Sequence, residues 1–472
     1  MIGIGIIGLG TVGVGTFRIL NDSNALLLEK TGLDVRVVKV ADIDLDRDRG
    51  IDIERGILTK DAHEVIEDKD VDIVVELVGG ITPAFDYICS AIKRKKWVVT
   101  ANKALLAEKG DEIFALIEKE NCEIGFEASV CGGIPVIRAI RDGLVGNNIN
   151  YILGILNGTS NYILTKMTEE GVSFGSALKD AQNLGYAEQD PTLDIEGIDA
   201  AHKLSILIRL AFHCPVATND ILTSGITKIE PIDIEFAREF GYRIKLIGLA
   251  SEKDGFVDAR VEPAMIPLSH PMSNVNGVYN AVYVVGDRVG PNLFYGKGAG
   301  ADPTGSSVVS DIIDMAYRIN ARDIKARIPR FKNSKVTIRK GGDSQFPFYM
   351  RITTEDRTGV LSKISGILSN YDISISTVIQ KGRKEKGHVP IVMLTHEASE
   401  NNLKKAKVEI DRLPFIKGES VHIRIEEGNL CLLYTSDAAD DLLCLDPGGR
   451  RIIKKKKYYI IPFKYSQHHN NS

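Results

Sequence analysis

The sequence opens with an apolar run, residues 2–7, that leads directly into the glycine-rich motif GLGTVG at residues 8–13. A buried strand, a G-x-G-x-x-G spacing and a following helix are typical of a βαβ unit that binds a dinucleotide. In this motif the first glycine permits a tight turn, the second admits a pyrophosphate, and the third allows close packing of helix and sheet. This segment therefore predicts a parallel sheet with helices packed on it.

Further apolar strands are expected at residues 34–41, 71–78, 97–100 and 123–126, with helical segments between them. Strands that alternate with helices form βαβ units, so residues 1–147 are predicted to be α/β, with a Rossmann-type, doubly wound parallel sheet. Asp42 follows the second strand, where its carboxylate is placed to accept a hydrogen bond from a ribose 2′-OH.

The residue after Asp42 bears on the choice between NAD and NADP. An arginine at this position would favour the 2′-phosphate of NADP, but the chain has Ile43. Arg47 and Arg49, a few residues further on, are the candidate partners for such a phosphate. The sequence therefore leaves both cofactors open.

Two further domains are predicted after the first. Residues 148–326 mix strands with long helices, including one at 196–212, and are expected to form an α+β domain for substrate binding and dimerisation. Residues 327–345 contain basic, glycine and serine residues and are predicted to be a linker. Residues 346–427 follow the order strand–helix–strand–strand–helix–strand, which is typical of a compact ferredoxin-like module.

The composition excludes several classes of protein. The 472 residues are 44% hydrophobic and 26% charged with a formal net charge of −4, which gives no argument for binding nucleic acid or a membrane. No apolar run approaches the length of a membrane span, and the N-terminal residues lack the pattern of a signal peptide. The six cysteines show no C-x-x-C spacing, so neither a zinc knuckle nor a disulfide framework is expected, and a cytoplasmic location fits best.

Residues 185–203 place several carboxylates and one lysine in a loop that runs into a helix. On this helix Asp199 and Lys203 are four residues apart and share one face. In isolation this pattern is that of a surface ion pair. Glu188 and Asp194 in the preceding loop can, however, converge on the same place, and acids beside a lysine suit the binding of an ammonium group and the donation of a proton.

Six separate stretches, in the same order, resemble one family of enzymes. They are GLGTVG (8–13), ELVGG (76–80), TANK (100–103), EASVCGGIPVI (127–137), LNGTSNYIL (156–164) and GYAEQDPTLDIEGIDAAHKL (185–204). Through them, residues 1–427 resemble a homoserine dehydrogenase with a C-terminal ACT domain. That resemblance implies the reversible NAD(P)H-dependent reduction of L-aspartate 4-semialdehyde to L-homoserine, a step in threonine, methionine and isoleucine biosynthesis.

Two other functions compete with this interpretation. A dehydrogenase acting on a related amino-acid aldehyde would use the same kind of cofactor loop and lysines. A catalytically silent amino-acid sensor would have no reason to keep both Lys103 and Lys203, so the presence of the two lysines argues against it.

The resemblance implies roles for individual residues. Lys203 is the expected proton donor to the developing alkoxide, Asp199 orients it, and Lys103 is a second cation near the nicotinamide, the substrate carboxylate or the alkoxide. The expected substrate contacts are Glu188, Asp194, Gly185 and Thr159. The expected cofactor contacts are Gly8, Gly10, Thr11, Val12, Gly13, Asp42, Thr100, Lys103 and Gly300.

A cation site is also implied by the resemblance. Glu127 and the backbone carbonyls of Val130, Gly132 and Ile134 match a monovalent-cation site of the family, and ligation by oxygen alone suits sodium. A glycine-rich turn joining two domains would explain the same segment, and both can hold at once. Cys131 stands where the family commonly has alanine or glycine, and it is expected to preserve the backbone path without reacting.

The motif Asp-Arg-Thr-Gly-Val-Leu at residues 356–361 resembles the strand-to-helix turn of ACT domains. By this resemblance, such modules pair through their sheets and commonly bind an amino acid at the interface. Threonine is the expected effector, since it lies downstream of homoserine in biosynthesis. A purely structural or dimerising role stays open. The chain is expected to form a homodimer or a homotetramer.

The end of the sequence, residues 431–472, does not match the rest. CLLYTSDAAD (431–440) and GGRRII followed by lysines (448–457) resemble one reading frame of a sequencing adapter that runs into poly-A. A basic interaction tail is the alternative. Residues 428–472 are therefore predicted to be an artefactual segment without a function.

Overall fold

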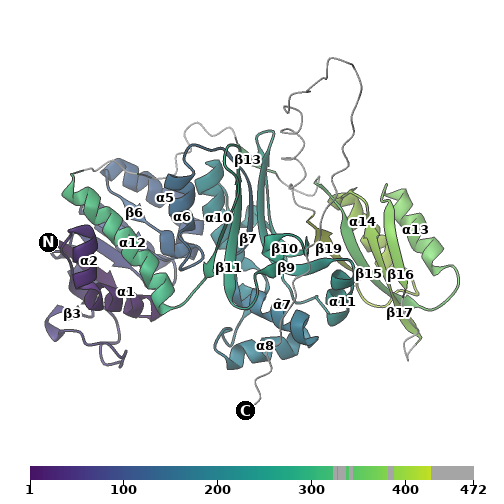
Figure 1. Ribbon diagram of the computed structural model, residues 1–472, viewed down its shortest axis with the longest axis horizontal. Coiled ribbons are helices and arrows are strands. Elements are labelled where there is room, and N and C mark those ends of the chain that lie inside the picture. Colours follow the sequence, from purple (N-terminus) through teal and green to yellow (C-terminus); the bar gives the residue numbers. More distant parts are fainter. Residues whose placement is uncertain (323–326, 328–335, 340–343, 381–386, 427–472) are drawn as a thin grey trace, which may run out of the picture. The chain divides into compact units, whose positions relative to one another are not determined.

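The computed structural model describes residues 1–322, 327, 336–339, 344–380 and 387–426 (Figure 1). The predicted tail at 428–472 lies outside these ranges, as does most of the predicted linker at 327–345. In the part of the chain that is described, no helix is both long enough and apolar enough to cross a lipid bilayer.

The N-terminal domain contains a six-stranded parallel sheet in the order β3-β2-β1-β4-β5-β6. The strands are β1 (Ile2–Ile7), β2 (Val35–Ala41), β3 (Leu58–Thr59), β4 (Ile73–Glu76), β5 (Trp97–Thr100) and β6 (Ile124–Gly125). The helices between them are α1 (Thr11–Asp22), α2 (Asn24–Thr31), α3 (Ala62–Glu67), α4 (Thr82–Lys93) and α5 (Lys103–Glu120). Because the strand order reverses between β1 and β4, a ligand is expected at the carboxyl ends of these two strands. The predicted Rossmann-type sheet is confirmed.

A helix from much later in the chain completes this domain. Helix α12 (Ala301–Asn320) lies beside α1, and Figure 1 shows the two together. They touch at two glycines, because a Cβ on Gly15 would lie 2.1 Å from the carbonyl oxygen of Ala301, and a Cβ on Gly305 would lie 2.8 Å from the backbone of Gly15. The sequence grouped α12 with the second domain, whereas its packing joins it to the first.

The second domain is built around the strands β7 (Ile149–Ile155), β9 (Tyr242–Lys253), β10 (Phe256–Pro267), β11 (Tyr279–Gly286) and β12 (Gly290–Lys297). Its helices are α6 (Val136–Arg138), continued by a π-helical turn (Ala139–Gly143), then α7 (Gly158–Glu170), α8 (Phe174–Asn183), α9 (Thr192–Ile195), α10 (Ile198–Phe212) and α11 (Pro231–Glu239). The strands run in the order β12-β11-β7-β9-β10, and the short β8 (Leu222–Thr223) and β13 (Thr337–Ile338) add to β10. Helix α10 contacts β7, β9 and β10, so the sheet supports the helix that carries Asp199 and Lys203.

The C-terminal module has the predicted order of elements. They are β15 (Phe348–Glu355), α13 (Val360–Asn370), β16 (Ile375–Gln380), β17 (His388–Thr395), α14 (Glu400–Asp411) and β19 (Val421–Ile425), with a small pair, β14 (Gln345–Phe346) and β18 (Ala398–Ser399), beside them. The module has its own buried core, which includes Met350, Ile364 and Leu403. The ferredoxin-like prediction is confirmed.

Buried polar contacts join this module to the second domain. Strand β19 continues the central sheet by pairing in parallel with β10. Arg351 on β15 donates its Nε hydrogen to the Oδ1 atom of Asp233 at 2.7 Å, and the Tyr349 hydroxyl donates to the same oxygen at 2.8 Å. Asp233 lies on α11 and is fully buried. The two parts therefore share one continuous sheet and a buried ion pair.

Candidate active site

The loop after β1 has the geometry that a pyrophosphate needs. Gly8 has a φ of +101°, and a Cβ on Gly13 would lie 2.1 Å from the Gly8 carbonyl oxygen. Apart from Gly10 itself and its two chain neighbours, none of the described residues has an atom within 4 Å of the position that a Cβ on Gly10 would take, so the backbone there is open to a ligand. Helix α1 begins at Thr11, with Val12 in its first turn, and directs its free N–H groups towards this opening. The residues present therefore fit a dinucleotide.

Asp42 lies against the same loop. Its Oδ2 atom accepts a hydrogen bond from the backbone N–H of Leu9 at 2.6 Å, and its Oδ1 atom accepts one from Arg49 at 2.9 Å. Arg49 also donates to the Leu9 carbonyl at 3.0 Å, whereas Ile43 is exposed. The predicted ribose acceptor and one predicted phosphate partner thus lie together beside the loop, and this arrangement does not choose between NAD and NADP.

A buried carboxylate links the carboxyl ends of β4 and β5. Glu76 accepts a hydrogen bond from the Thr100 hydroxyl at 2.6 Å and another from the backbone N–H of Val78 at 2.8 Å. Asn102 donates its amide hydrogens to the carbonyls of Val78 and Gly80 and caps helix α5, which begins at Lys103. Burial raises the pKa of Glu76 to about 7. These contacts fix the loop from which Lys103 extends.

Asp199 is the residue at which the two predicted cations meet. Its Oδ2 atom lies 2.7 Å from the Nζ atom of Lys203, and its Oδ1 atom lies 2.8 Å from the Nζ atom of Lys103. The side chains of Asp199 and Lys203 are 7% and 10% exposed, while that of Lys103 is 43% exposed. The structure therefore brings together all three predicted catalytic residues, from α5 of the first domain and α10 of the second.

The charges of these groups support one another. Burial alone would raise the pKa of Asp199, but the attraction of Lys203 and Lys103 holds that pKa well below its usual range. Burial alone would lower the pKa of Lys203, but the neighbouring Asp199 carboxylate raises it above its ordinary value. With two ammonium groups around one carboxylate, the three side chains carry a net positive charge, which suits an alkoxide or a substrate carboxylate.

An asparagine joins this cluster to the acidic loop. The Nδ2 atom of Asn157 donates to Asp194 at 2.6 Å and to Asp199 at 2.9 Å, and its Oδ1 atom caps helix α7 by accepting from Ser160. Asn157 lies in the stretch 156–164 that carries the family resemblance, but the sequence did not predict this bridge between two aspartates. The predicted substrate residue Asp194 therefore lies at the site.

The remaining predicted substrate residues lie at the edge of the site. The Thr159 hydroxyl donates to the Tyr186 carbonyl at 2.7 Å and so holds the loop that contains Gly185, which has a φ of +74°. Glu188 is exposed, and no contact of its carboxylate with Asp199 or Lys203 is formed. The structure thus brings the loop to the site without bringing Glu188 to the lysines.

The start of the catalytic helix differs from the prediction. Helix α10 begins at Ile198, two residues later than expected, because Gly197 has a φ of +82° and separates it from the short helix α9. Glu196 precedes this break and accepts a hydrogen bond from the Thr227 hydroxyl at 3.2 Å. The left-handed residue sets the direction of α10, and the predicted pairing of Asp199 with Lys203 is unaffected.

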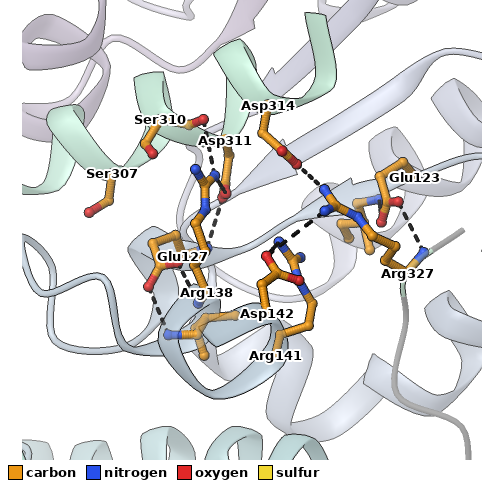
Figure 2. Close-up of polar contacts among 12 residues, drawn as sticks. Glu123, Glu127, Arg138, Arg141, Asp142, Ser307, Ser310, Asp311, Asp314 and Arg327 are labelled. Carbon is orange, nitrogen blue, oxygen red and sulfur yellow. Dashed lines mark hydrogen bonds and ion pairs between the residues drawn. The ribbon is translucent and has the colours of Figure 1, made fainter. Parts of the chain in front are cut away.

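Glu127, the predicted cation ligand, lies in a network of charged residues at the boundary of the two domains (Figure 2). Its carboxylate accepts hydrogen bonds from the backbone N–H groups of Ile137 and Arg138, both at 2.8 Å. Its own backbone N–H donates to Asp311 on α12 at 2.8 Å, and the Arg138 guanidinium reaches the same aspartate, as Figure 2 shows. Burial and then the charge of Asp311 raise the pKa of Glu127 to about 7.

The carbonyls predicted to join Glu127 belong to a tight turn. Cys131 is buried with a φ of +55°, and a Cβ on Gly132 would lie 2.5 Å from the Gly298 carbonyl oxygen. The carbonyls of Gly132 and Ile134 accept hydrogen bonds from the Ser307 hydroxyl and from a backbone N–H, respectively, and Val130 is buried beside them. The turn also meets the second glycine-rich segment, in which Gly300, with a φ of +128°, precedes α12. The segment is therefore a close junction of the two domains, which agrees with the prediction of a glycine-rich turn that joins them.

A glycine-rich loop that fits a dinucleotide, in a chain that also has a buried carboxylate–lysine cluster, is typical of a nicotinamide-dependent oxidoreductase. Three family models match the chain: the homoserine dehydrogenase NAD-binding domain over residues 8–127, homoserine dehydrogenase over residues 135–313, and the ACT domain over residues 348–415. The chain belongs to the homoserine dehydrogenase family. Its reaction is the reversible, nicotinamide-dependent interconversion of L-aspartate 4-semialdehyde and L-homoserine.

Similarity to individual proteins extends over most of the chain. A homoserine dehydrogenase of Neisseria gonorrhoeae is 43% identical over 430 residues, covering 90% of this chain and 98% of the relative, and one of Helicobacter pylori is 42% identical over 425 residues, covering 90% and 99%. The crystal structure of a homoserine dehydrogenase from Thiobacillus denitrificans matches with a TM-score of 0.84 at 42% identity, covering 90% of this chain and 98% of that one.

The buried carboxyl group of Glu76 makes the stability of the protein depend on pH. An acid whose pKa is raised on folding stabilises the protein below its unfolded pKa, and this contribution is lost as the pH rises through the folded pKa. Between pH 4.5 and about 7, ionisation of Glu76 therefore removes about 3 kcal/mol from the free energy of unfolding. Urea denaturation measures the free energy of unfolding of Glu76→Gln and of the wild type. The difference, variant minus wild type, is expected to rise by about 3 kcal/mol between pH 5 and pH 8, because only the wild type loses this contribution.

The exposed Glu67 provides a matched control, because Glu67→Gln removes a carboxylate at the surface of the same domain. Its difference from the wild type is expected to stay constant over that pH range. A constant difference for Glu76→Gln as well would show that the buried carboxyl does not titrate as described.

Proposed function

We propose that Lys203 donates the proton that completes the reduction of the aldehyde. Two of its three N–H groups are held, one by Asp199 at 2.7 Å and one by the Leu156 carbonyl at 2.6 Å. None of the described residues accepts the third, which is therefore available to a substrate oxygen. This geometry, a buried ammonium with one undirected N–H, is the single observation that carries the proposal.

A nicotinamide cofactor held at the loop of residues 8–13 would supply the hydride, and the residues of the chain stabilise the negative charge that develops on the substrate oxygen. The substrate oxygen becomes an alkoxide, which a buried ammonium stabilises and then protonates. Asp199 keeps Lys203 charged until that step because its carboxylate raises the pKa of the lysine. In the reverse direction, neutral Lys203 accepts the proton from the homoserine hydroxyl.

Lys103 is proposed to bind the substrate or the nicotinamide side of the cofactor. It shares Asp199 with Lys203, but its side chain is much more exposed, so it faces the opening of the site. Its position at the start of α5, after β5, is the carboxyl edge of the sheet where ligands bind. Asp194, held by Asn157, and Glu188 are proposed to bind the substrate ammonium group.

Sodium is proposed at Glu127 and the carbonyls of Val130, Gly132 and Ile134. One carboxylate with several carbonyl oxygens is a donor set that suits a hard monovalent cation. Three of these four groups already accept hydrogen bonds within the chain, but each oxygen keeps a further lone pair. A cation there would also favour the ionised form of Glu127, which burial opposes.

The C-terminal module is proposed to bind threonine and to regulate the enzyme. Helix α13 follows Gly359, whose φ of +86° forms the tight turn that the motif predicted. The module continues the central sheet through β19 and β10, and β10 contacts the catalytic helix α10. A ligand that favours one arrangement of the module can thereby affect the site.

The chain is proposed to act as a homodimer or homotetramer in a reducing cytoplasm. Strand β12 ends the central sheet and exposes Leu293 and Tyr295, which a second copy could cover. The described cysteines are free thiols, Cys89, Cys122, Cys131 and Cys214. Free thiols are typical of proteins that work in a reducing compartment.

The variant Lys203→Ala tests the proposed proton donor. Loss of a positioned general acid lowers kcat for aldehyde reduction by about 10²- to 10⁴-fold. The rate is measured from the absorbance of the reduced nicotinamide with aspartate semialdehyde. Lys166→Ala is the control, because Lys166 is an ion-paired lysine on α7 that lies outside the site, and it retains the wild-type rate. A Lys203→Ala rate within about threefold of wild type would contradict the mechanism.

Threonine regulation is tested at the turn before α13. A side chain at Gly359 must adopt a left-handed conformation, at a cost of about 1–2 kcal/mol, which distorts the proposed effector turn. Gly359→Val is expected to raise the threonine concentration for half-inhibition at least tenfold, without changing the rate in the absence of threonine. Gly418→Val introduces a similar strain elsewhere in the module, where φ is +74°, and keeps its sensitivity. An equal loss of threonine sensitivity in both variants, or a wild type that threonine does not inhibit, would contradict this proposal.

A further inference from the structure

The carbonyl of Leu156 connects the catalytic lysine to a residue that has no assigned role. Its oxygen accepts one hydrogen bond from the Nζ atom of Lys203 at 2.6 Å and a second from the Nδ2 atom of Asn280 at 2.8 Å. A carbonyl oxygen has two lone pairs, so these two donors fill its acceptor capacity. The direction of the Leu156 carbonyl is therefore set by Asn280 as well as by the backbone.

The register of two strands places Asn280 at this carbonyl. Strands β11 and β7 are antiparallel, and Ala281 pairs with Ile155. The next residues along the two strands, Asn280 and Leu156, therefore lie opposite each other at the end of the sheet. From there Asn280 reaches the site in which α10 places Lys203.

The side chain of Asn280 is held in one orientation. Asn280 is 1% exposed. A Cβ on Gly298 would lie 2.2 Å from the Cγ atom of Asn280, so the backbone of Gly298 packs closely on the amide group. Its Nδ2 atom lies 3.6 Å from the Sγ atom of Cys131. Only Nδ2 can face the Leu156 carbonyl, because the Oδ1 atom has no hydrogen to donate.

The other end of the same amide has no partner. Among the described residues, none donates a hydrogen bond to the Oδ1 atom of Asn280, although that atom is buried. An unsatisfied buried acceptor costs about 1–3 kcal/mol, so an apolar residue of this size would be the more stable choice for packing alone. Side chains that lower stability in this way are typical of functional sites.

We propose that Asn280 is a positioning residue for proton transfer. It fixes the Leu156 carbonyl, which fixes the second N–H of Lys203, and the third N–H is thereby directed at the substrate oxygen. This inference rests on the proposed role of Lys203 as the proton donor. It predicts that Asn280 affects the chemical step and the titration of Lys203 more than the binding of substrate.

The test uses the full-length enzyme and three variants of Asn280. Asn280→Ala removes the donor to Leu156, and Asn280→Ser replaces it with a hydroxyl on a shorter side chain. For both, kcat is expected to fall about 10- to 100-fold because a small misplacement of a catalytic group costs about this much. The KM values for homoserine and for the nicotinamide cofactor are expected to change less than threefold. Serine serves as the smaller perturbation if the alanine variant does not fold.

Asn280→Asp tests the link to Lys203 through the pH profile. It places a negative charge within a few ångström of the ammonium, which raises the pKa of Lys203. Homoserine oxidation needs neutral Lys203, so its rate rises with pH as Lys203 loses its proton, and this rise is the alkaline limb of the pH profile. In Asn280→Asp the alkaline limb is expected to move to higher pH by about 1–3 units. A residue that only supported the fold would change the melting temperature without moving this limb.

Asn147 provides a matched control at the other end of the same strands. Its Oδ1 atom accepts from the backbone N–H of Val289, and its Nδ2 atom donates to the Leu144 carbonyl. Asn147→Ala therefore removes comparable hydrogen bonds far from Lys203 along β7 and β11. It is expected to lower the melting temperature and to leave the pH profile in place.

A double-variant cycle separates this inference from the proposed function. If Asn280 acts through Lys203, then adding Asn280→Ala to Lys203→Ala causes no further loss of kcat. Full activity of Lys203→Ala would overturn the proposed proton donor. If Lys203→Ala is inactive as expected, additive losses or an unmoved pH limb in Asn280→Asp would overturn the role of Asn280 alone. Failure of all three Asn280 variants to fold, while Asn147→Ala folds, would assign Asn280 to the scaffold and also overturn the inference.

Discussion

The contact of one buried carboxylate with two lysines is the interaction on which the site depends. Asp199 accepts from Lys203 and from Lys103, which belong to different domains. Burying an ammonium without a counter-charge costs several kcal/mol, so the buried Lys203 would not stay charged at this place without the carboxylate. The same contact keeps the proton donor protonated and joins the cofactor domain to the substrate domain.

Contacts from the surrounding fold hold these three side chains in position. Glu76 and Asn102 fix the loop that presents Lys103, and Asn157 ties Asp199 to the acidic loop through Asp194. Leu156 at the end of β7 supplies the second acceptor for Lys203. Local sequence sets each of these elements, but only the packing of the two domains brings them within hydrogen-bonding distance.

The sequence predicted the parallel sheet, the C-terminal module and the pairing of Asp199 with Lys203, because each follows from short-range periodicity. It placed the start of α10 near Glu196, because the apolar residues from Ile198 onward recur at helical spacing. The positive φ of Gly197 delays the helix to Ile198. Strand β12 was missed because its sequence, GPNLFYGK, contains residues that usually mark turns.

The long-range contacts of the site lay beyond sequence reasoning. The pairing of Lys103 with Asp199 was not predicted, because the family resemblance implied only a second cation near the nicotinamide, the substrate carboxylate or the alkoxide. The convergence of Asn280 and Lys203 on Leu156 depends on the register of β7 and β11, which no local pattern encodes. Packing of α12 on α1 likewise depends on two distant glycines, Gly15 and Gly305.

The most direct measurement of this account is the pH dependence of homoserine oxidation by Asp199→Asn. This change keeps the shape of the side chain and removes the charge that raises the pKa of Lys203. The pH range over which the oxidation rate rises is expected to move to lower pH by about 1–3 units, while kcat for aldehyde reduction falls because the lysine is less often protonated. An unmoved limb with a wild-type rate of reduction would contradict the central role of Asp199.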